Sequence, residues 1–283
     1  MTVSLVMATV DRVDEARRLV DSLAVQTDAP FELVVVDQNA DRRLDAVVAG
    51  ARAMGIEVVH DRFAERNLSA ARNRGLALAR GSVVGFPDDD CWYEPDVVRR
   101  VSAFLAAQRD YGGVVVRWHE QDPAGRPAHD LARDDWRRFR AAPASSIALF
   151  LRKSVLGALG GFDARFGVSR FFGAGEETDL LLRALEAGHR IRYEPTIVVH
   201  HAFGRPASGP VAQACRRTRS RERGTGGLYA KHRLPAHVIA RGIVAPLVKP
   251  LRTPWSARAI LDGACTTLGR IEGLLKWKRA ASD

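Results

Sequence analysis

Three consecutive aspartates, Asp88, Asp89 and Asp90, follow an apolar run at Ser82–Phe86. Carboxylates this close raise each other's proton affinity unless a cation lies among them. Mg²⁺ and Mn²⁺ prefer carboxylate oxygens and often use one or two of them, with phosphate oxygens completing the shell. The group therefore indicates a divalent-metal site for a phosphorylated ligand. A solvated acidic turn before the next helix is the alternative.

A second acidic group opens a predicted helix. Gly173 and Gly175 precede Glu176, Glu177 and Asp179. Glycine lets the backbone approach a ligand, and the helix dipole favours carboxylates in the first turn. The three acids are candidates for a catalytic base, although an ordinary acidic helix start has the same pattern.

Two further groups offer contacts for an anion or a metal. Arg72 and Asn73 lie on a helix predicted at Leu68–Arg80, ahead of the aspartates. A guanidinium there would neutralise a pyrophosphate, or would be a surface arginine. His200 and His201 follow an apolar run, and imidazole binds Mn²⁺, but paired histidines at a strand end are also common without a metal.

Apolar runs predict the strands that would position these groups, at Val3–Met7, Phe31–Val36, Ile56–His60 and Ser82–Phe86. Predicted helices alternate with them: one after Asp11 as N-cap, one near Leu44–Met54, and one at Leu68–Arg80 between Asn67 as N-cap and Gly81 as stop. Strands that are apolar throughout indicate an α/β fold with a mostly parallel central sheet covered on both faces. Ligands bind at the carboxyl ends of such strands, where Asp37 and the three aspartates lie.

The second half of the chain is less regular. Strands are predicted at Gly113–Trp118 and Ile147–Leu151, a helix at Glu177–Ala187, and a loop or lid at Gln121–Pro143. The segment Gly204–Pro210 is rich in turn formers and is a candidate domain boundary.

Positive charge is concentrated at the end of the chain. Residues 216–283 hold 15 Lys and Arg against 4 Asp and Glu, whereas residues 1–215 hold 28 against 29. Apolar residues such as Ile239 and Leu247 lie among these cations, which favours docking on an anionic membrane. A helical subdomain packed on the rest is the alternative. Nucleic-acid binding is disfavoured, because the acidic clusters would repel phosphate.

The cysteines and the apolar segments bear on location. Cys91, Cys215 and Cys265 are odd in number and lack metal-type spacing, which indicates free thiols in a reducing compartment. The N-terminus has no cationic stretch before its short apolar run, and Val238–Val248 is shorter than the ~20 residues that cross a bilayer. We expect a cytoplasmic protein that docks peripherally, if at all, on the inner face of the membrane.

Taken in order along the chain, the motifs resemble those of the family 2 glycosyltransferases, inverting enzymes of the Rossmann-like GT-A fold. The resemblance rests on six segments: Ser4–Arg12, Glu32–Asn39, Leu68–Gly75, Phe86–Asp90, Gly160–Asp163 and Gly175–Asp179. It implies a glycosyltransferase domain at residues 1–205, with a nucleotide-binding half at 1–90 and an acceptor-binding half at 91–205. Residues 206–283 would form a basic, largely helical C-terminal extension.

The resemblance also implies a nucleotide site. Thr9 and Arg12 would line the nucleotide pocket, Asp37 would meet the base or ribose, and Arg72 with Asn73 would flank the nucleotide or pyrophosphate.

An Asp-x-Asp motif would follow the fourth strand. Asp88 and Asp89 would lie on the nucleotide side of this motif, and Asp90 would bind the metal. His201, six residues after Pro195, fits the metal-proximal histidine of the family better than its neighbour does.

The catalytic base would come from the second acidic group. Many relatives carry Glu-Asp where this chain has Glu176-Glu177, so Glu177 is the expected base, with Glu176 as reserve and Asp179 beside them. The implied reaction moves a sugar from a UDP-, GDP- or dTDP-sugar to a hydroxyl of a glycan, glycolipid or small molecule, with Mn²⁺ or Mg²⁺ on the leaving diphosphate. A sugar-phosphate nucleotidyltransferase is the alternative enzyme, but no Gly-rich, Lys-containing phosphate loop follows the first strand. An inactive scaffold of the same fold is a further alternative.

Overall fold

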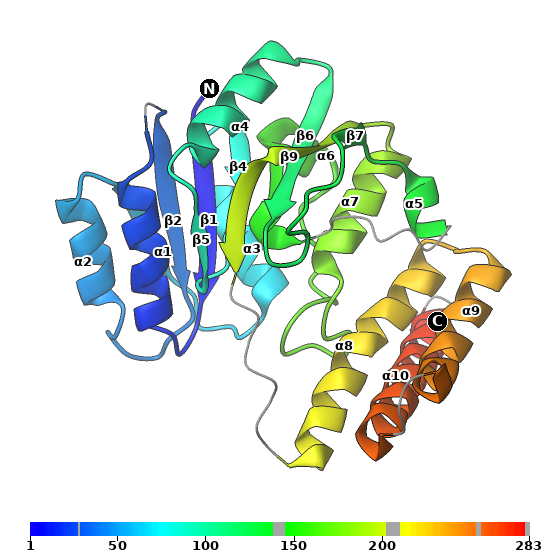
Figure 1. The fold of residues 1–283 in the computed structure, drawn as a ribbon. Coiled ribbons are helices and arrows are strands. Elements are labelled where there is room, and N and C mark those ends of the chain that lie inside the picture. The colour runs from blue at the N-terminus through cyan, green and yellow to red at the C-terminus, as the bar shows by residue number, and fades with distance from the viewer. Residues whose placement is uncertain (28, 138–144, 202–209, 253–255, 281–283) are drawn as a thin grey trace. The chain divides into compact units, whose positions relative to one another are not determined.

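The computed structural model describes the chain except residues 28, 138–144, 202–209, 253–255 and 281–283 (Figure 1). It divides into two compact units. The first comprises residues 1–132, 142–162 and 180–203, and the second comprises residues 133–141, 163–179 and 204–283. Residues 163–179, expected within the domain at 1–205, thus group with the C-terminal part. The division at 205 stays a prediction, since most of Gly204–Pro210 lies outside the described residues.

One nine-stranded sheet is formed by the described strands of the first unit. They are β1 (Val3–Thr9), β2 (Phe31–Asp37), β3 (Glu57–Arg62), β4 (Val83–Gly85), β5 (Cys91–Tyr93), β6 (Tyr111–Trp118), β7 (His129–Asp130), β8 (Leu149–Arg152) and β9 (Arg190–His201). The order is β3-β2-β1-β4-β8-β6-β9-β5, with β7 beside β9. The first four are parallel to one another, as predicted, and β6 and β9 are parallel to each other. Antiparallel β8 joins the two groups, and antiparallel β5 lies at the edge.

Helices cover both faces of the parallel half. They are α1 (Asp14–Ala24), α2 (Asp45–Ala53) and α3 (Leu68–Leu78) (Figure 1). Met7 and Val35 lie with Val20 of α1 and Val47 of α2, whereas Gly75 of α3 lies against Val6 and Val36 on the other face. Alternate residues of each strand point to opposite faces, so strands buried on both faces must be largely apolar.

The ends of these helices test the predicted caps. The Asn67 side chain accepts a hydrogen bond from the N–H of Ala70 at 3.2 Å and caps α3, as predicted. The prediction for Asp11 is wrong: α1 begins three residues later, and the N–H of Asp11 donates to Asn39 Oδ1. Gly81 does not end α3, which stops at Leu78; instead its missing side chain makes room for Ser4.

The remaining helices complete the chain: α4 (Val97–Ala107), α5 (Arg133–Arg137), α6 (Lys153–Ala158), α7 (Glu176–Glu186), α8 (Val211–Lys231), α9 (Ala236–Val248) and α10 (Ala257–Ala280). The segment Gln121–Pro143, predicted as a loop or lid, contains β7 and α5, and residues 138–143 lie outside the described part. Helices α8, α9 and α10 confirm the largely helical C-terminal region.

Glycines let α8 and α10 pack closely within the second unit. A Cβ atom at Gly226 would overlap the carbonyl oxygen of Arg270, and one at Gly273 would overlap that of Arg223. The backbones therefore approach along both helices, which fixes their register. No helix in the described residues is long and apolar enough to cross a membrane.

A disulfide joins the same two helices. Cys215 and Cys265 are bonded, with their Cα atoms 5.7 Å apart, while Cys91 is free and buried. The expectation of free thiols is therefore wrong for two of the three cysteines. An odd count shows only that one cysteine is left over, and helix packing decides which two meet.

Candidate active site

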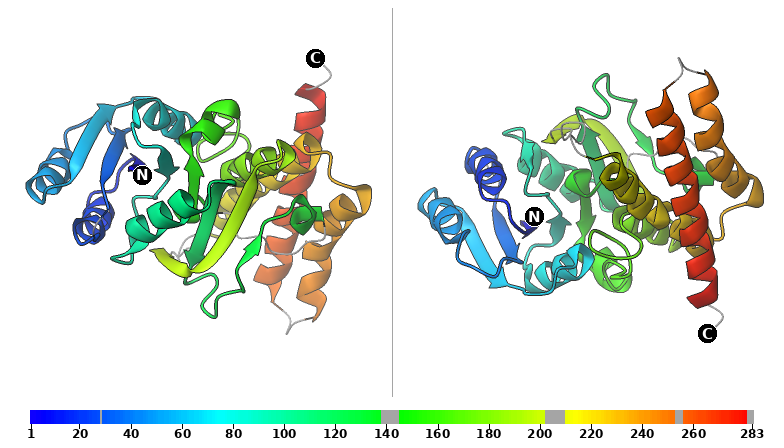
Figure 2. Two further views of the ribbon diagram at one scale, coloured as in Figure 1. Left: turned by 90° about the horizontal axis from the view of Figure 1, so that it is seen from above. Right: turned by 90° about the horizontal axis from the view of Figure 1, so that it is seen from below.

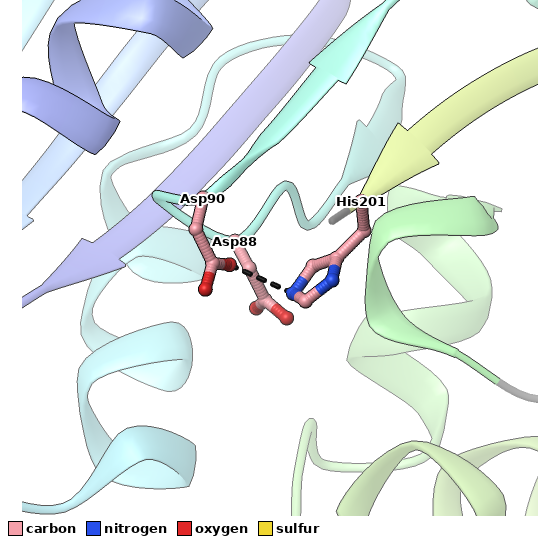
Figure 3. A group of neighbouring side chains, drawn as sticks. All are labelled: Asp88, Asp90 and His201. Atoms are coloured by element: carbon pink, nitrogen blue, oxygen red, sulfur yellow. Dashed lines mark ion pairs between the residues drawn. The ribbon is translucent and has the colours of Figure 1, made fainter. Parts of the chain in front are cut away.

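Asp88, Asp90 and His201 bring their ligand atoms within 4.8 Å of one another (Figure 3). Asp88 follows β4 and bridges to Ala8 of β1, and the pairing of Cys91 with His201 brings Asp90 to the end of β9. Nε2 of His201 lies 2.8 Å from Oδ1 of Asp90. Two carboxylates and an imidazole are a donor set that fits Mn²⁺ or Mg²⁺, so these residues would suit the expected metal.

The neighbouring histidine faces other partners. Nδ1 of His200 lies 2.8 Å from Glu120, Nε2 lies 2.9 Å from Glu94, and the ring stacks on Trp92. Of the two histidines, only His201 joins the aspartates; that it binds the metal, as the resemblance implies, stays a prediction.

Arg72 is buried behind the aspartates. Its side chain is 1% exposed, and Nη2 donates to Oδ1 of Asp88 at 2.6 Å. The guanidinium also lies over the ring of Phe162, 5.4 Å from its centroid. Ser146, which the sequence analysis did not single out, has its hydroxyl 3.4 Å from both oxygens of Asp88. Arg72 is therefore a buried partner of an aspartate rather than a surface arginine, and its expected contact with pyrophosphate stays a prediction.

Thr9 and Arg12 converge on the middle aspartate. The Thr9 hydroxyl donates to Asp89 at 2.7 Å, and Nη1 of Arg12 donates to it at 2.8 Å and also contacts Asp90. Burial raises the pKa of Asp89 to about 6, against the opposing effects of Thr9 and Arg12. The structure thus places both predicted nucleotide-pocket residues beside the acidic group.

The pKa of Asp90 is lowered, whereas that of Asp89 is raised. Burial opposes the ionisation of Asp90, but the hydrogen bond and charge of His201 together with the charge of Arg12 outweigh burial and lower its pKa. Asp90 is therefore held as a carboxylate, which is the form that binds a cation.

Asp37 ends β2 directly beside Thr9 of β1. It is fully buried and accepts hydrogen bonds from the backbone N–H and the side chain of Asn39 at 2.9 and 2.7 Å. Nε2 of His60 lies 3.1 Å away. The carboxylate orders the loop after β2, and its expected contact with the base or ribose stays a prediction. The sequence could have indicated Asn39 and His60 as residues near the site, because Asn39 follows one predicted strand and His60 ends another.

Asn73 is engaged by the backbone of Phe162. Its side-chain amide donates to the carbonyl oxygen at 2.8 Å, and its Oδ1 accepts from the N–H at 2.7 Å. Gly161, at φ 73°, allows this approach because its Cβ would collide with Oδ1. Asn73 therefore holds the backbone of Phe162, whose ring lies against Arg72. The expected contact of Asn73 with the nucleotide stays a prediction.

The second acidic group lies at the start of α7, within the second unit. Asp179 is fully buried and lies 2.6 Å from Nζ of Lys231 and 2.9 Å from Nε2 of His232, at the end of α8. Glu176 is 6% exposed, whereas Glu177 is partly exposed. Asp179 thus holds α7 to α8 by an ion pair, and the choice of base among the three acids stays a prediction.

Sequence comparison matches more than half of the chain to one family. The profile of glycosyl transferase family 2 covers residues 4–167. A PGL/p-HBAD biosynthesis glycosyltransferase of Mycobacterium bovis is 33% identical over 154 residues, which are 52% of this chain and 58% of that protein. A glucosyl-dolichyl phosphate glucuronosyltransferase of Haloferax volcanii is 34% identical over 98 residues, 34% of this chain and 31% of that protein. The chain therefore matches less than two thirds of the length of these relatives.

Solved structures share the fold. The structure of S. aureus TarS residues 1–349 in complex with UDP-GlcNAc aligns with a TM-score of 0.62 at 14% identity, covering 99% of this chain and 92% of that one. The mannosyltransferase PcManGT of Pyrobaculum calidifontis, in complex with GDP-Man and Mn²⁺, aligns with a TM-score of 0.61 at 18% identity, covering 99% and 75%. The expected GT-A fold is confirmed.

Proposed function

This chain belongs to glycosyl transferase family 2, and on that premise we propose that it moves a sugar from a nucleotide-diphosphate-sugar to an acceptor hydroxyl. The observation that carries the proposal is the meeting of Asp88, Asp90 and His201 at the carboxyl end of the parallel sheet. Two solved neighbours hold UDP-GlcNAc, and GDP-Man with Mn²⁺, which supports a nucleotide-sugar as the donor.

The donor would bind where carboxylates and cations meet. Asp90 and His201 would hold Mn²⁺ or Mg²⁺, with Asp88 beside them, and a cation bound there neutralises charge developing on the leaving diphosphate. Arg12 is suited to assist, because its side chain is 45% exposed although it contacts Asp89 and Asp90. We infer that Arg12 turns from the aspartates to the diphosphate oxygens when the donor binds.

Glu177 is the proposed catalytic base. In an inverting displacement, its carboxylate accepts the proton of the acceptor hydroxyl as that oxygen attacks the anomeric carbon, while the diphosphate leaves from the opposite side. Asp179 is the weakest of the three candidates, because Lys231 and His232 already hold its carboxylate in an ion pair. Glu177 is favoured over Glu176 because its side chain is the more exposed.

The acceptor is proposed to be a glycolipid or another cell-envelope glycan. The name of one relative refers to a dolichyl phosphate, which is a lipid phosphate. The basic residues of 216–283 would bring the enzyme to an anionic membrane, at the cytoplasmic face if the expected location holds.

A thermal-unfolding panel tests the donor and metal together. UDP-, GDP- and dTDP-sugars are added with Mn²⁺ and with EDTA, and one should raise the midpoint only with the metal. At ~100 times its dissociation constant, a ligand adds about 2.7 kcal/mol to stability. Asp90→Ala should abolish the shift, while Asp21→Ala, at an exposed aspartate of α1, should retain it. No shift with any donor would refute the proposal, and pyrophosphate release from a nucleoside triphosphate would favour the nucleotidyltransferase instead.

A further inference from the structure

Helix α10 carries an uncovered apolar stripe. Leu261, Leu268 and Leu275 are 38%, 49% and 48% exposed, and Ala264 and Ile271 are partly exposed between them. Their spacing alternates between three and four residues, which places all five on one side of the helix. At 1.5 Å per residue the stripe runs for about 20 Å along the helix surface.

The other sides of α10 are occupied within the second unit. One side meets α8 through the disulfide of Cys265 and the close approach of Gly273, and another meets α9 through Thr267, which donates to the carbonyl oxygen of Ile243. Both views in Figure 2 show α9 and α10 running side by side. The leucines therefore lie on the side that neither helix covers.

The charges of α10 lie off the stripe. Arg270 pairs with Glu222 at 2.6 Å, and Glu272 pairs with Arg219 and Arg223, all across the contact with α8. The stripe itself contains no charged residue. The helix is thus amphipathic, and its Glu272 is paired with two arginines of α8.

The C-terminal part of the chain that carries the stripe is strongly basic. Residues 216–283 hold 15 cationic against 4 acidic side chains, and Arg216, Arg217, Arg258 and Lys276 are all exposed. A second copy of the chain would bring the same excess of positive charge to the contact, which disfavours pairing through this face. An anionic lipid surface offers the opposite charge and an apolar layer beneath it.

We propose that the stripe of α10 inserts into the interfacial layer of an anionic membrane, with exposed arginines and lysines of the same C-terminal part on lipid phosphates. Helix α10 lies in the plane of the surface and does not cross the bilayer. This inference deepens the proposed function, on which it rests for membrane docking, by naming the face that docks.

Vesicle co-sedimentation at low salt tests the stripe. The full chain is incubated with vesicles of equimolar phosphatidylglycerol and phosphatidylcholine, with its disulfide intact. The double variant Leu268→Gln, Leu275→Gln should bind at least about tenfold more weakly, because two apolar side chains no longer leave water. Met54→Gln, at an exposed methionine of the first unit, is the matched control and should bind as the parent does. Vesicles of phosphatidylcholine alone, or high salt, should weaken binding of the parent.

Three results would overturn the inference: equal binding by the double variant, equal binding to both vesicle types, or a dimer in light scattering that the double variant converts to monomer. The last would assign the stripe to a second copy of the chain. Retained unfolding midpoints exclude misfolding as the cause of lost binding. The nucleotide-sugar panel is run on the same samples, so failure of donor binding is seen separately from failure of docking.

Discussion

Replacing Arg72 by methionine removes the buried cation behind Asp88 while keeping an unbranched side chain of similar length. Arg72 is 1% exposed, and its guanidinium donates to Asp88 at 2.6 Å. In the variant, Asp88 keeps Ser146 within 3.4 Å but loses its positive partner. The substitution therefore measures how much the positive charge of Arg72 stabilises Asp88 at this partly buried position.

The expected cost follows from the burial of the pair. Breaking a buried ion pair by removing one partner costs about 3–5 kcal/mol. Because the Asp88 side chain is 33% exposed and water reaches it, we expect the lower end, about 3 kcal/mol. At ~2–4 °C per kcal/mol for a unit of 150–250 residues, the unfolding midpoint should fall by about 6–12 °C.

Thermal and urea unfolding, followed by circular dichroism in EDTA, measure this loss. Arg72→Lys serves as the matched variant, because it keeps the charge but loses the planar fork, and should lie between the parent and Arg72→Met. If a divalent cation binds beside Asp88, then Mn²⁺ with the preferred nucleotide should restore part of the stability of Arg72→Met. A loss below about 1 kcal/mol, the range of an exposed pair, would refute the assignment of a buried pair.

Three further substitutions and one control test the other assignments. Glu177→Gln should keep the nucleotide-sugar shift in unfolding but lower the transfer rate by about 10²–10⁴-fold, and a rate within about tenfold of the parent would exclude it as the base. His201→Ala should weaken Mn²⁺ binding measured by calorimetry, whereas an unchanged affinity would remove it from the site. Gly226→Ala should destabilise the protein by about 1–3 kcal/mol, because the added methyl meets the backbone of α10. As a control, Gly50→Ala, in a helix with open space around that position, should instead stabilise the protein by about 0.5–1 kcal/mol. Equal effects of the two glycine substitutions would contradict the close packing of α8 against α10.

The parallel half of the fold follows from sequence because its signals are local. Strands buried on both faces must be largely apolar, and their carboxyl ends share one edge of the sheet. Asp37 and Asp88 each follow such a run, which is why their place at that edge was predictable. The antiparallel insertion of β8 was not, because strand pairing across a long connection leaves no periodic pattern.

Local sequence patterns could not decide which of His200 and His201 lies beside Asp90. Adjacent residues of a strand point to opposite faces, so only one of the two can meet Asp90. The pairing of Cys91 with His201 decides which one, and that register joins strands far apart in the chain. Resemblance to the family favoured His201, which the structure places beside Asp90, and its role as a metal ligand stays a prediction. The disulfide of Cys215 and Cys265 depends in the same way on how two helices pack.

The spacing of the three acids of α7 in the sequence determines which of them are buried and which is partly exposed. Glu176 and Asp179 are three residues apart and share a face with Leu180, and all three are buried. Glu177 lies about a quarter turn from that face and is partly exposed. An acid on the buried face is held by packing and by partners such as Lys231, whereas a base must reach an acceptor that arrives from solvent. The same spacing that makes Asp179 an anchor of α8 leaves Glu177 partly exposed, which favours it as the base, and that role stays a prediction.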